Sequence, residues 1–352
     1  MYVLARPNVG GLQTTLRNRI RALADQGVRS EVAYFEQGEG EYLFDRIPHR
    51  LILSPSDFQE VVRNGRFDCL SFIYTTEYME HVPDDYAGKI LYEVRGWNKQ
   101  VALNVNGLGQ VRKVDGVLCI AKYLKPVVLK HLKRHIPVYV DGNAVDPMFR
   151  FIRHPNRSWD DCPVPDKNRK VIAFVGRLDR SKNWRQFVRI CGKVNETEPI
   201  EPWIICNRND AVAMASLFRR LSRKGLLDVA KVIVHVPNHR MPELYSAVRR
   251  SGGCLLSASE REGLGNHVLE PMACGLPIVS SNVPGKNEII KHRHNGMLYR
   301  LNDTDQAVRY VKELLHDKEL RRRLRSNGLN TIRRDFNPPR YAVRFQKILS
   351  KL

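Results

Sequence analysis

The chain has 352 residues, which is enough for two domains that each bury a core of their own. Its composition, with 43% apolar residues, is that of a soluble α/β protein, and no apolar run is long enough to cross a bilayer. The net charge of +21 permits nucleic acid, an anionic membrane surface or a polyanionic acceptor as partner, but no nucleic-acid-binding motif is present, so no specific nucleic acid is expected. The seven cysteines show no metal-ligand spacing, which predicts reduced core residues in a cytoplasmic protein.

The first half of the chain alternates short apolar runs with segments of helical periodicity. The runs predict strands at residues 2–5, 31–35, 51–53, 69–74, 90–94, 117–120 and 138–140. Because most of these runs are continuous rather than alternating, the strands fit a buried parallel sheet. After the first strand comes a loop with Gly10 and Gly11, and then Leu16 and Ile20 at helical spacing predict a helix with Arg19 on another face.

A polar, proline-punctuated stretch at residues 154–169 interrupts this alternation and predicts an interdomain linker. Beyond it the alternation resumes, with strands expected at residues 171–175, 203–206, 232–236, 254–257 and 278–280. Two series of this kind predict two doubly wound domains that face each other across a cleft. Ligands in such sheets bind at the carboxyl ends of the strands.

The segment from Glu262 to Glu270 joins three features that suit a phosphorylated sugar. Small residues at 263–265 let backbone N–H groups approach a ligand closely. The run from Asn266 to Ala273 predicts a helix, whose N-terminus favours anions. The two carboxylates can accept hydrogen bonds from sugar hydroxyls. His267, between them, is expected to face away from both ends of the segment.

Basic side chains follow two of the expected strands. Arg177 and Lys182 lie just beyond residues 171–175, where a diphosphate would bind, and the alternative is an ordinary basic loop. Lys286 follows residues 278–280, and contact with phosphate or a plain strand-to-helix connection are both open. Asp303-Thr304-Asp305 has the form of a metal–diphosphate motif, but its position favours helix capping.

Together these motifs resemble the retaining glycosyltransferases of family 4, glycosyl transferases group 1. The resemblance covers most of the chain and is most specific in its C-terminal half. It implies the GT-B fold, an α/β architecture of two facing Rossmann-like doubly wound domains with an interdomain cleft. The implied domains are an acceptor-binding domain at residues 1–160, a nucleotide-sugar donor domain at 161–337 and a C-terminal helix at 338–352 that returns to the first domain.

The resemblance also implies the site residues. Arg177 and Lys182 would bind the donor diphosphate and steady its departure, and Glu262 would lie near the transferred sugar. The donor-binding residues that it implies are Gly10, Gly11, Gly263, Leu264, Gly265, Asn266 and Glu270, the last of which would hold the ribose. Neither a metal nor a cofactor is implied, because the nucleotide sugar is a co-substrate and the departing phosphate helps to deprotonate the acceptor.

The chain departs from the family pattern at two places. Arg95 stands where many members have a histidine that contacts the donor sugar, and an anionic sugar or an acceptor phosphate would suit an arginine. Asn207-Arg208-Asn209 replaces a common glycine pair, which leaves the base of the nucleotide open.

The expected function is retaining transfer of a sugar from a nucleotide-diphosphate donor, with UDP favoured, to a cell-surface glycan, lipid-linked or secondary-metabolite acceptor. Basic residues at 122–134, beside Leu124 and Val128, predict peripheral contact with the inner membrane face. One alternative is a catalytically silent sugar- or nucleotide-binding relative that serves as an interaction module. A nicotinamide-dependent oxidoreductase is disfavoured because Gly-x-Gly-x-x-Gly is missing after the first strand. A nucleic-acid-binding protein would rest on charge alone.

Overall fold

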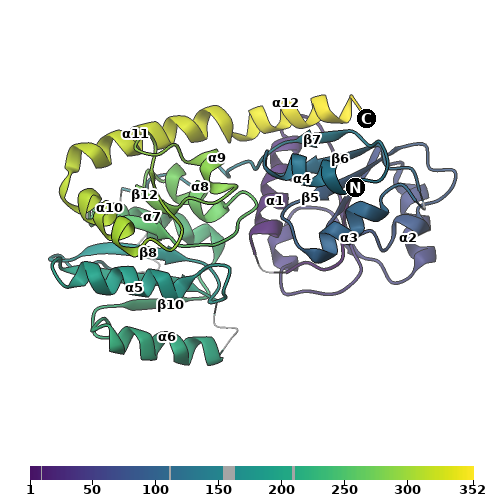
Figure 1. Cartoon of the computed structure of the whole chain (residues 1–352). Helices are drawn as coiled ribbons and strands as arrows, with labels where there is room; N and C mark the ends of the chain where they lie inside the picture. Colours follow the sequence, from purple (N-terminus) through teal and green to yellow (C-terminus); the bar gives the residue numbers. More distant parts are fainter. Residues whose placement is uncertain (9, 111, 154–162, 208–210) are drawn as a thin grey trace. The chain divides into compact units, whose positions relative to one another are not determined.

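The computed structural model describes residues 1–8, 10–110, 112–153, 163–207 and 211–352. These residues form two compact units (Figure 1). Unit 1 comprises residues 1–144 and 335–352, and unit 2 comprises residues 145–334. The expected domain boundary between residues 160 and 161, and most of the expected linker, lie outside the described residues.

Unit 1 is built on a parallel sheet of seven strands in the order β3-β2-β1-β4-β5-β6-β7. The strands are β1 (Tyr2–Leu4), β2 (Val32–Tyr34), β3 (His49–Leu51), β4 (Cys69–Ile73), β5 (Lys89–Val94), β6 (Gly116–Cys119) and β7 (Val138–Val140). The helices are α1 (Gly11–Ala24), α2 (Pro55–Gly65), α3 (Lys99–Gly107), α4 (Leu124–His131) and, from the C-terminal end of the chain, α12 (Pro338–Leu349), with 3-10 turns η1 (Glu41–Phe44) and η2 (Met79–His81).

The third strand of unit 1 lies two residues earlier than the sequence predicts. Strand β3 ends at Leu51, and the side chain of Leu53 is largely exposed. The reason is the start of α2, where the Ser54 hydroxyl accepts a hydrogen bond from the Asp57 N–H and the Asp57 carboxylate accepts one from the Leu53 N–H. Leu53 therefore belongs to the capping turn of α2 rather than to the sheet.

Helix α1 is buried on more faces than its apolar spacing predicts. Leu16 and Ile20 are buried as expected, but Arg19 is buried too. Helix α12 packs beside α1 and covers the face on which Arg19 lies, with Tyr341 and Phe345 against the guanidinium. Arg19 thus lies on another face of α1 than Leu16 and Ile20, as predicted, but this face is covered by a helix from the distant C-terminal end.

Unit 2 is built on a parallel sheet of six strands in the order β10-β9-β8-β11-β12-β13. The strands are β8 (Lys170–Val175), β9 (Ile200–Cys206), β10 (Lys231–Val234), β11 (Cys254–Ser257), β12 (Ile278–Ser281) and β13 (Met297–Tyr299). The helices are α5 (Trp184–Asn195), α6 (Ala211–Arg223), α7 (Met241–Arg250), α8 (Asn266–Ala273), α9 (Lys286–Ile289), α10 (Thr304–His316) and α11 (Lys318–Asp335), with one 3-10 turn, η3 (Asn238–Arg240). Strand β13 is an addition to the expected strands.

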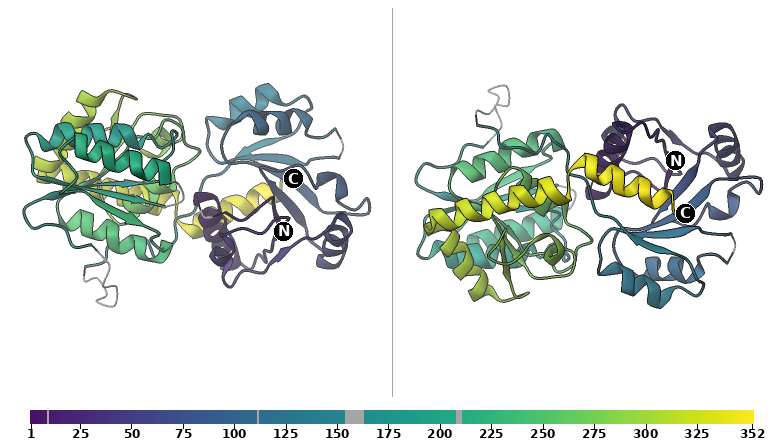
Figure 2. Two further views of the ribbon diagram at one scale, coloured as in Figure 1. Left: turned by 90° about the horizontal axis from the view of Figure 1, so that it is seen from below. Right: turned by 90° about the horizontal axis from the view of Figure 1, so that it is seen from above.

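Both units are layered, with helices on the two faces of each sheet (Figure 2). In each sheet the strand order reverses beside the first strand of the unit, between β1 and β4 in unit 1 and between β8 and β11 in unit 2. Such reversals leave a crevice at the carboxyl ends of the strands, because the connections on either side leave in opposite directions. These two edges are therefore the places to look for ligand sites. Among the described residues, no helix combines the length and apolarity needed to span a bilayer.

Candidate active site

The loop after β8 carries Arg177 and Lys182 and is organised by one carboxylate. Asp179 accepts hydrogen bonds from the Ser181 hydroxyl (2.6 Å), the Lys182 N–H (3.0 Å) and the Arg177 Nε–H (2.8 Å). Burial alone would raise the pKa of Asp179, but these bonds hold it below its ordinary value. The loop thus presents the Arg177 side chain to solvent, with 66% of it exposed, and turns Lys182 inward.

The loop after β11 joins the loop after β8 at the point where the strand order reverses. The Glu260 N–H donates to the Ser181 carbonyl at 2.8 Å. The Lys182 ammonium lies 2.5 Å from Oε1 of Glu262, and both side chains are mostly buried. The structure therefore brings together Lys182 and Glu262, two residues that are 80 positions apart in the sequence.

The Glu262 carboxylate is ionised at neutral pH. Burial alone would raise its pKa, but His267, the Lys182 ammonium and Lys286 lower the pKa to about 2. An ionised carboxylate paired with an ammonium in a partly buried site can exchange that partner when a ligand brings its own charges. A diphosphate would compete for Lys182 in this way.

Gly263–Gly265 lie directly before the N-terminus of α8. The helix begins at Asn266, as predicted, and no side chain caps it. Among the described residues, no protein acceptor for the N–H groups of Gly263 and Gly265 is present. Gly285, with φ of 84°, packs so closely that a Cβ there would lie 2.2 Å from the Gly263 carbonyl oxygen. Backbone donors at a helix N-terminus favour an anion.

The expectation that His267 faces away from the ends of the segment is wrong for Glu262. Its Nε2 lies 3.7 Å from Oε1 of Glu262 and 2.8 Å from the Ser257 hydroxyl oxygen. The prediction failed because Glu262 lies in the loop before α8, so helical spacing does not relate the two residues. Burial lowers the pKa of His267 to about 3, so the imidazole is neutral.

Glu270 lies on α8 and is buried, where the Tyr245 hydroxyl donates to its Oε2 at 3.4 Å. Burial and the neighbouring Glu270 raise the pKa of Tyr245, so the phenol keeps its proton. Asp303, by contrast, caps α10 by accepting from the Gln306 N–H at 2.9 Å, which confirms the capping interpretation. No cluster of His, Cys, Asp and Glu suited to a metal ion occurs within the described ranges.

Unit 1 holds the remaining predicted residues. Gly10 precedes α1 in an extended conformation and Gly11 is the first residue of α1, so the expected loop is shorter than predicted. Arg95 follows β5 and is buried, with Nη1 3.2 Å from Glu93 Oε2 and Nη2 2.9 Å from Asn143 Oδ1. Its guanidinium therefore points into unit 1. The sequence had suggested contact with an anionic sugar or an acceptor phosphate instead.

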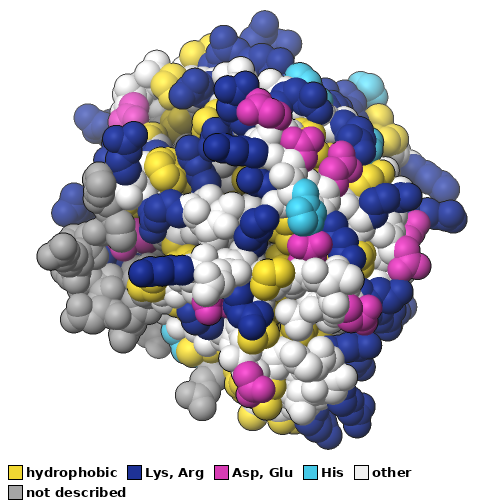
Figure 3. Space-filling model, turned by 90° about the vertical axis from the view of Figure 1, so that its left-hand side faces the viewer, with side chains coloured by type: hydrophobic (Ala, Val, Ile, Leu, Met, Phe, Trp, Pro, Cys, Tyr) yellow, Lys and Arg dark blue, Asp and Glu magenta, His cyan; other side chains and the backbone are white. Residues whose placement is uncertain are grey.

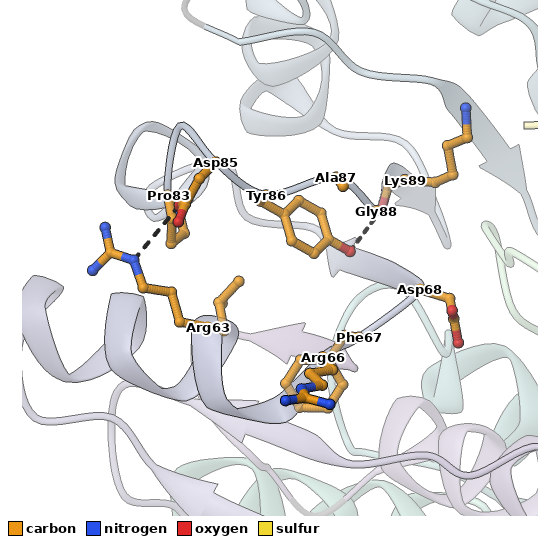
Figure 4. Close-up of a pocket in the computed structure, with 11 residues that line it drawn as sticks. Arg63, Arg66, Phe67, Asp68, Pro83, Asp85, Tyr86, Ala87, Gly88 and Lys89 are labelled. Atoms are coloured by element: carbon orange, nitrogen blue, oxygen red, sulfur yellow. Dashed lines mark hydrogen bonds and ion pairs between the residues drawn. The ribbon is translucent and has the colours of Figure 1, made fainter.

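Unit 1 also contains a pocket of about 550 Å³ at the amino ends of its strands (Figure 4). Its lining comes from the end of α2 and from the residues before β4 and β5, including Phe67 and Tyr86. Arg63 and Asp85 form an ion pair of 3.6 Å at its rim. Because this pocket lies at the amino ends of the strands, it is separate from the edge at which doubly wound sheets bind ligands.

Comparison with known proteins agrees with this architecture. Residues 157–331 match the family model "Glycosyl transferases group 1". An uncharacterised glycosyltransferase of Methanocaldococcus jannaschii, MJ1069, is 23% identical over 68% of this chain and 59% of its own length. The sulfoquinovosyl transferase SQD2 of Arabidopsis thaliana is 24% identical over 89% of this chain and 65% of its own. The chain thus spans less than two thirds of the length of either relative.

Solved structures extend the likeness to both units. HepE of Anabaena, solved with UDP and glucose and also with UDP-glucose, has a TM-score of 0.83 and 16% identity, and each chain is covered in full. Sucrose-phosphate synthase of Thermosynechococcus elongatus has a TM-score of 0.80 and 13% identity over 100% of this chain and 98% of its own. The fold is therefore GT-B, with parallel sheets of seven and six strands. Within this class, the chain belongs to the glycosyl transferases group 1 family, which it matches through residues 157–331.

Three residues of the site escaped the sequence analysis or were undecided in it: His267, Lys286 and Ser257. Lys286 ends the connection from β12 to α9, as one of the two open interpretations has it, and its ammonium is fully buried among serine oxygens. A lysine directly after a glycine at a strand end was the only available signal. The second departure from the family pattern, at residues 207–209, lies mostly outside the described residues.

Proposed function

We propose that the protein is a retaining glycosyltransferase that takes its sugar from a nucleotide-diphosphate donor bound at the carboxyl edge of the unit 2 sheet. The observation that carries this proposal is the Lys182–Glu262 ion pair at the strand reversal between β8 and β11. In the proposed assignment Arg177 and Lys182 hold the diphosphate, and Glu262 accepts hydrogen bonds from the transferred sugar. The binding of UDP-glucose by the similar HepE favours a UDP donor.

The remaining predicted residues take supporting roles in this proposal. The N–H groups of residues 263–266 bind sugar and phosphate oxygens at the start of α8, and Glu270 holds the ribose. Unit 1 binds the acceptor, and Gly10 and Gly11 contact the donor diphosphate. Together with α12, this assigns residues 1–160 and 338–352 to the acceptor and 161–337 to the donor.

The chemistry follows from the charges that develop in the reaction. The bond between the anomeric carbon and the phosphate oxygen breaks, so positive charge grows on the sugar and negative charge on the diphosphate. Cations and N–H groups already in place at the diphosphate lower the barrier. The acceptor oxygen bonds to the anomeric carbon on the same face, and its proton passes to the departing phosphate. In this scheme, no metal takes part.

Thermal unfolding against UDP, GDP, ADP, CDP, dTDP and NAD tests the donor site. A ligand at about 100 times its dissociation constant adds about 2.7 kcal/mol to the free energy of unfolding. We expect UDP to raise the midpoint and NAD to leave it unchanged. Stabilisation by NAD alone would overturn the transferase proposal. Binding of UDP without turnover of any UDP-sugar would instead favour a catalytically silent relative.

We further propose that anionic lipid attracts the basic segment at residues 122–134 of unit 1. Of the apolar residues expected to assist, Leu124 and Val128 are buried in unit 1, whereas Leu129 is 51% exposed on α4. Lys and Arg side chains are also spread over the face of the molecule shown in Figure 3, so the charge of +21 does not mark this segment alone. The contact would therefore rest on charge, at about 1 kcal/mol for each basic residue near the surface.

Flotation with vesicles of anionic and of neutral lipid tests this contact. We expect binding to the anionic vesicles that weakens as salt is raised, because exposed charges are screened. Replacement of Lys125 and Lys130 by glutamine should reduce it more than the same change at Lys318 and Lys347, which lie on α11 and α12. The proposal is wrong if the protein does not float with the anionic vesicles at physiological salt.

A further inference from the structure

Lys286 is a buried ammonium group at the carboxyl edge of the unit 2 sheet. It is the first residue of α9 and is 0% exposed. Its Nζ donates to the Ser257 hydroxyl (3.2 Å), the Ser259 carbonyl (3.2 Å) and the Ser281 hydroxyl (2.5 Å). All three acceptors are neutral, and the carboxylate that acts on Lys286, Glu262, does so through its charge. Burial of an ammonium group with only neutral acceptors around it is costly. Lys286 therefore acts on its surroundings through the serine oxygens that it contacts.

The hydrogen-bond directions follow from the chemistry of these groups. An ammonium has only donors, so the Ser257 hydroxyl oxygen must accept from Lys286. The single hydrogen of that hydroxyl is then free to point to His267 Nε2, which lies 2.8 Å away. Pairing that hydrogen with Nε2 gives it an acceptor, and Nε2 then carries no hydrogen itself. A neutral imidazole in this position therefore has its hydrogen on Nδ1.

The Nδ1 edge of the ring lies at the entrance to α8. A Cβ added at Gly265, the residue before the helix, would lie 3.0 Å from Nδ1 and 2.8 Å from Cε1 of His267. The Nε2 edge lies 3.7 Å from Oε1 of Glu262. The imidazole thus lies beside both the Glu262 carboxylate and Gly265, the residue before α8.

We propose that Lys286 is a positioning residue that acts through Ser257 to hold His267 as the neutral Nδ1–H tautomer. This tautomer adds one N–H donor to the backbone donors at the start of α8, where it can meet an oxygen of a bound phosphate or sugar. It also leaves Lys182 as the donor to Glu262 Oε1, because the unprotonated Nε2 donates nothing. The consequence for ligand binding rests on the proposed function, whereas the tautomer itself does not.

The charged groups near the Lys286–Ser257–His267 relay agree with a neutral His267. Burial lowers the pKa of His267 to about 3; Glu262 opposes this shift, while Lys182 and Lys286 reinforce it. Burial also lowers the pKa of Lys286 to about 7; Glu262 opposes this shift and Lys182 reinforces it. A lysine with this pKa is charged below pH 7 and loses its charge as the pH rises through 7. The charged Lys286 therefore holds His267 as the Nδ1–H tautomer at about pH 6, and this constraint is lost at about pH 9.

Nitrogen-15 NMR of the histidine rings in the full chain tests the tautomer directly. The His267 signals are assigned by their loss in His267→Asn. At about pH 6 we expect a protonated Nδ1 and an unprotonated Nε2, and a shift toward the other tautomer at about pH 9. A wild-type His267 with hydrogen on Nε2, or one that titrates near its ordinary pKa, would overturn the proposal.

Three variants identify the path through which Lys286 acts. Lys286→Met and Ser257→Ala should both shift His267 toward the Nε2–H form, and Ser257→Ala carries the test if Lys286→Met does not fold. Ser281→Ala is the matched control, because it removes another acceptor of Lys286 without touching His267. The same spectrum in all three variants as in the wild type would contradict the relay.

Calorimetric titration with UDP separates this inference from the proposed function. Lys286→Met and Ser257→Ala should bind UDP about tenfold more weakly than Ser281→Ala, as expected for one hydrogen bond to a charged group. If the wild type binds no UDP, the proposed donor fails while the tautomer measurement still decides the relay. Equal binding by all variants, with the tautomer shifted as expected, would remove His267 from the ligand site.

Discussion

Arg177→Ala is expected to lower turnover of the donor by about 10²–10³-fold while the midpoint of thermal unfolding stays unchanged. The loss is that of one preorganised donor to the charge that develops on the diphosphate. Stability should be spared because 66% of the Arg177 side chain is exposed and Asp179, with which it pairs, lies in the same loop. Initial rates with the donor identified by thermal unfolding, and the unfolding curve of the same sample, measure the two quantities.

Arg180→Ala is the matched control for this prediction. Arg180 is an exposed arginine three positions further along the same loop, and we expect its replacement to change turnover less than about twofold. Equal losses in the two variants would show that the general charge of the loop matters, rather than a diphosphate contact at Arg177. Near-normal turnover in Arg177→Ala would remove that residue from the proposed catalytic set.

Glu93→Ala is expected to destabilise unit 1 by about 3–5 kcal/mol. The buried carboxylate of Glu93 accepts two bonds from Arg19, at 2.6 and 2.9 Å, and one from Arg95 at 3.2 Å. Burial alone would raise the pKa of Glu93, but the two guanidinium groups hold it below its ordinary value. Without this carboxylate, two buried cations lose their shared counter-charge.

Denaturant unfolding, followed by hydrogen exchange in α1 and α12, measures this loss where it occurs. Glu31→Ala provides the comparison, since Glu31 pairs with Arg50 near the surface of the same unit and such pairs contribute about 0–1 kcal/mol. We expect exchange in α12 to rise in Glu93→Ala, because Arg19 also contacts Tyr341 of α12. Similar unfolding of the two variants would contradict the account of this buried cluster.

Local patterns in the sequence predicted much of the sheet and the start of α8. Continuous apolar runs mark buried parallel strands, and the bounds of α8, Asn266–Ala273, follow from a glycine turn before a helix-compatible run. Strand β13, Met297–Tyr299, was not predicted from the sequence. The prediction placed β3 two residues too late, because Leu53 belongs to the capping turn of α2 and not to the sheet.

The parts that could not be predicted depend on contacts between distant segments. The spacing of apolar residues in α1 gives no sign that Arg19 is buried, because its partner Tyr341 lies 322 positions later. Lys286 is held by serines at the ends of β11 and β12, and a serine at a strand end gives no pattern that distinguishes it. The proximity of His267 to Glu262 depends on the path of the loop before α8, which helical spacing cannot describe.

The inclusion of α12 in unit 1 has a consequence for the order in which the chain can fold during synthesis. Residues 145–334 of unit 2 are complete before α12 has been made, whereas Arg19 lacks its cover until Tyr341 and Phe345 leave the ribosome. Domains generally fold as units, starting from the N-terminus. Here the unit that is begun first is completed only after residues 145–334 have been made, so its buried arginine gains its cover last.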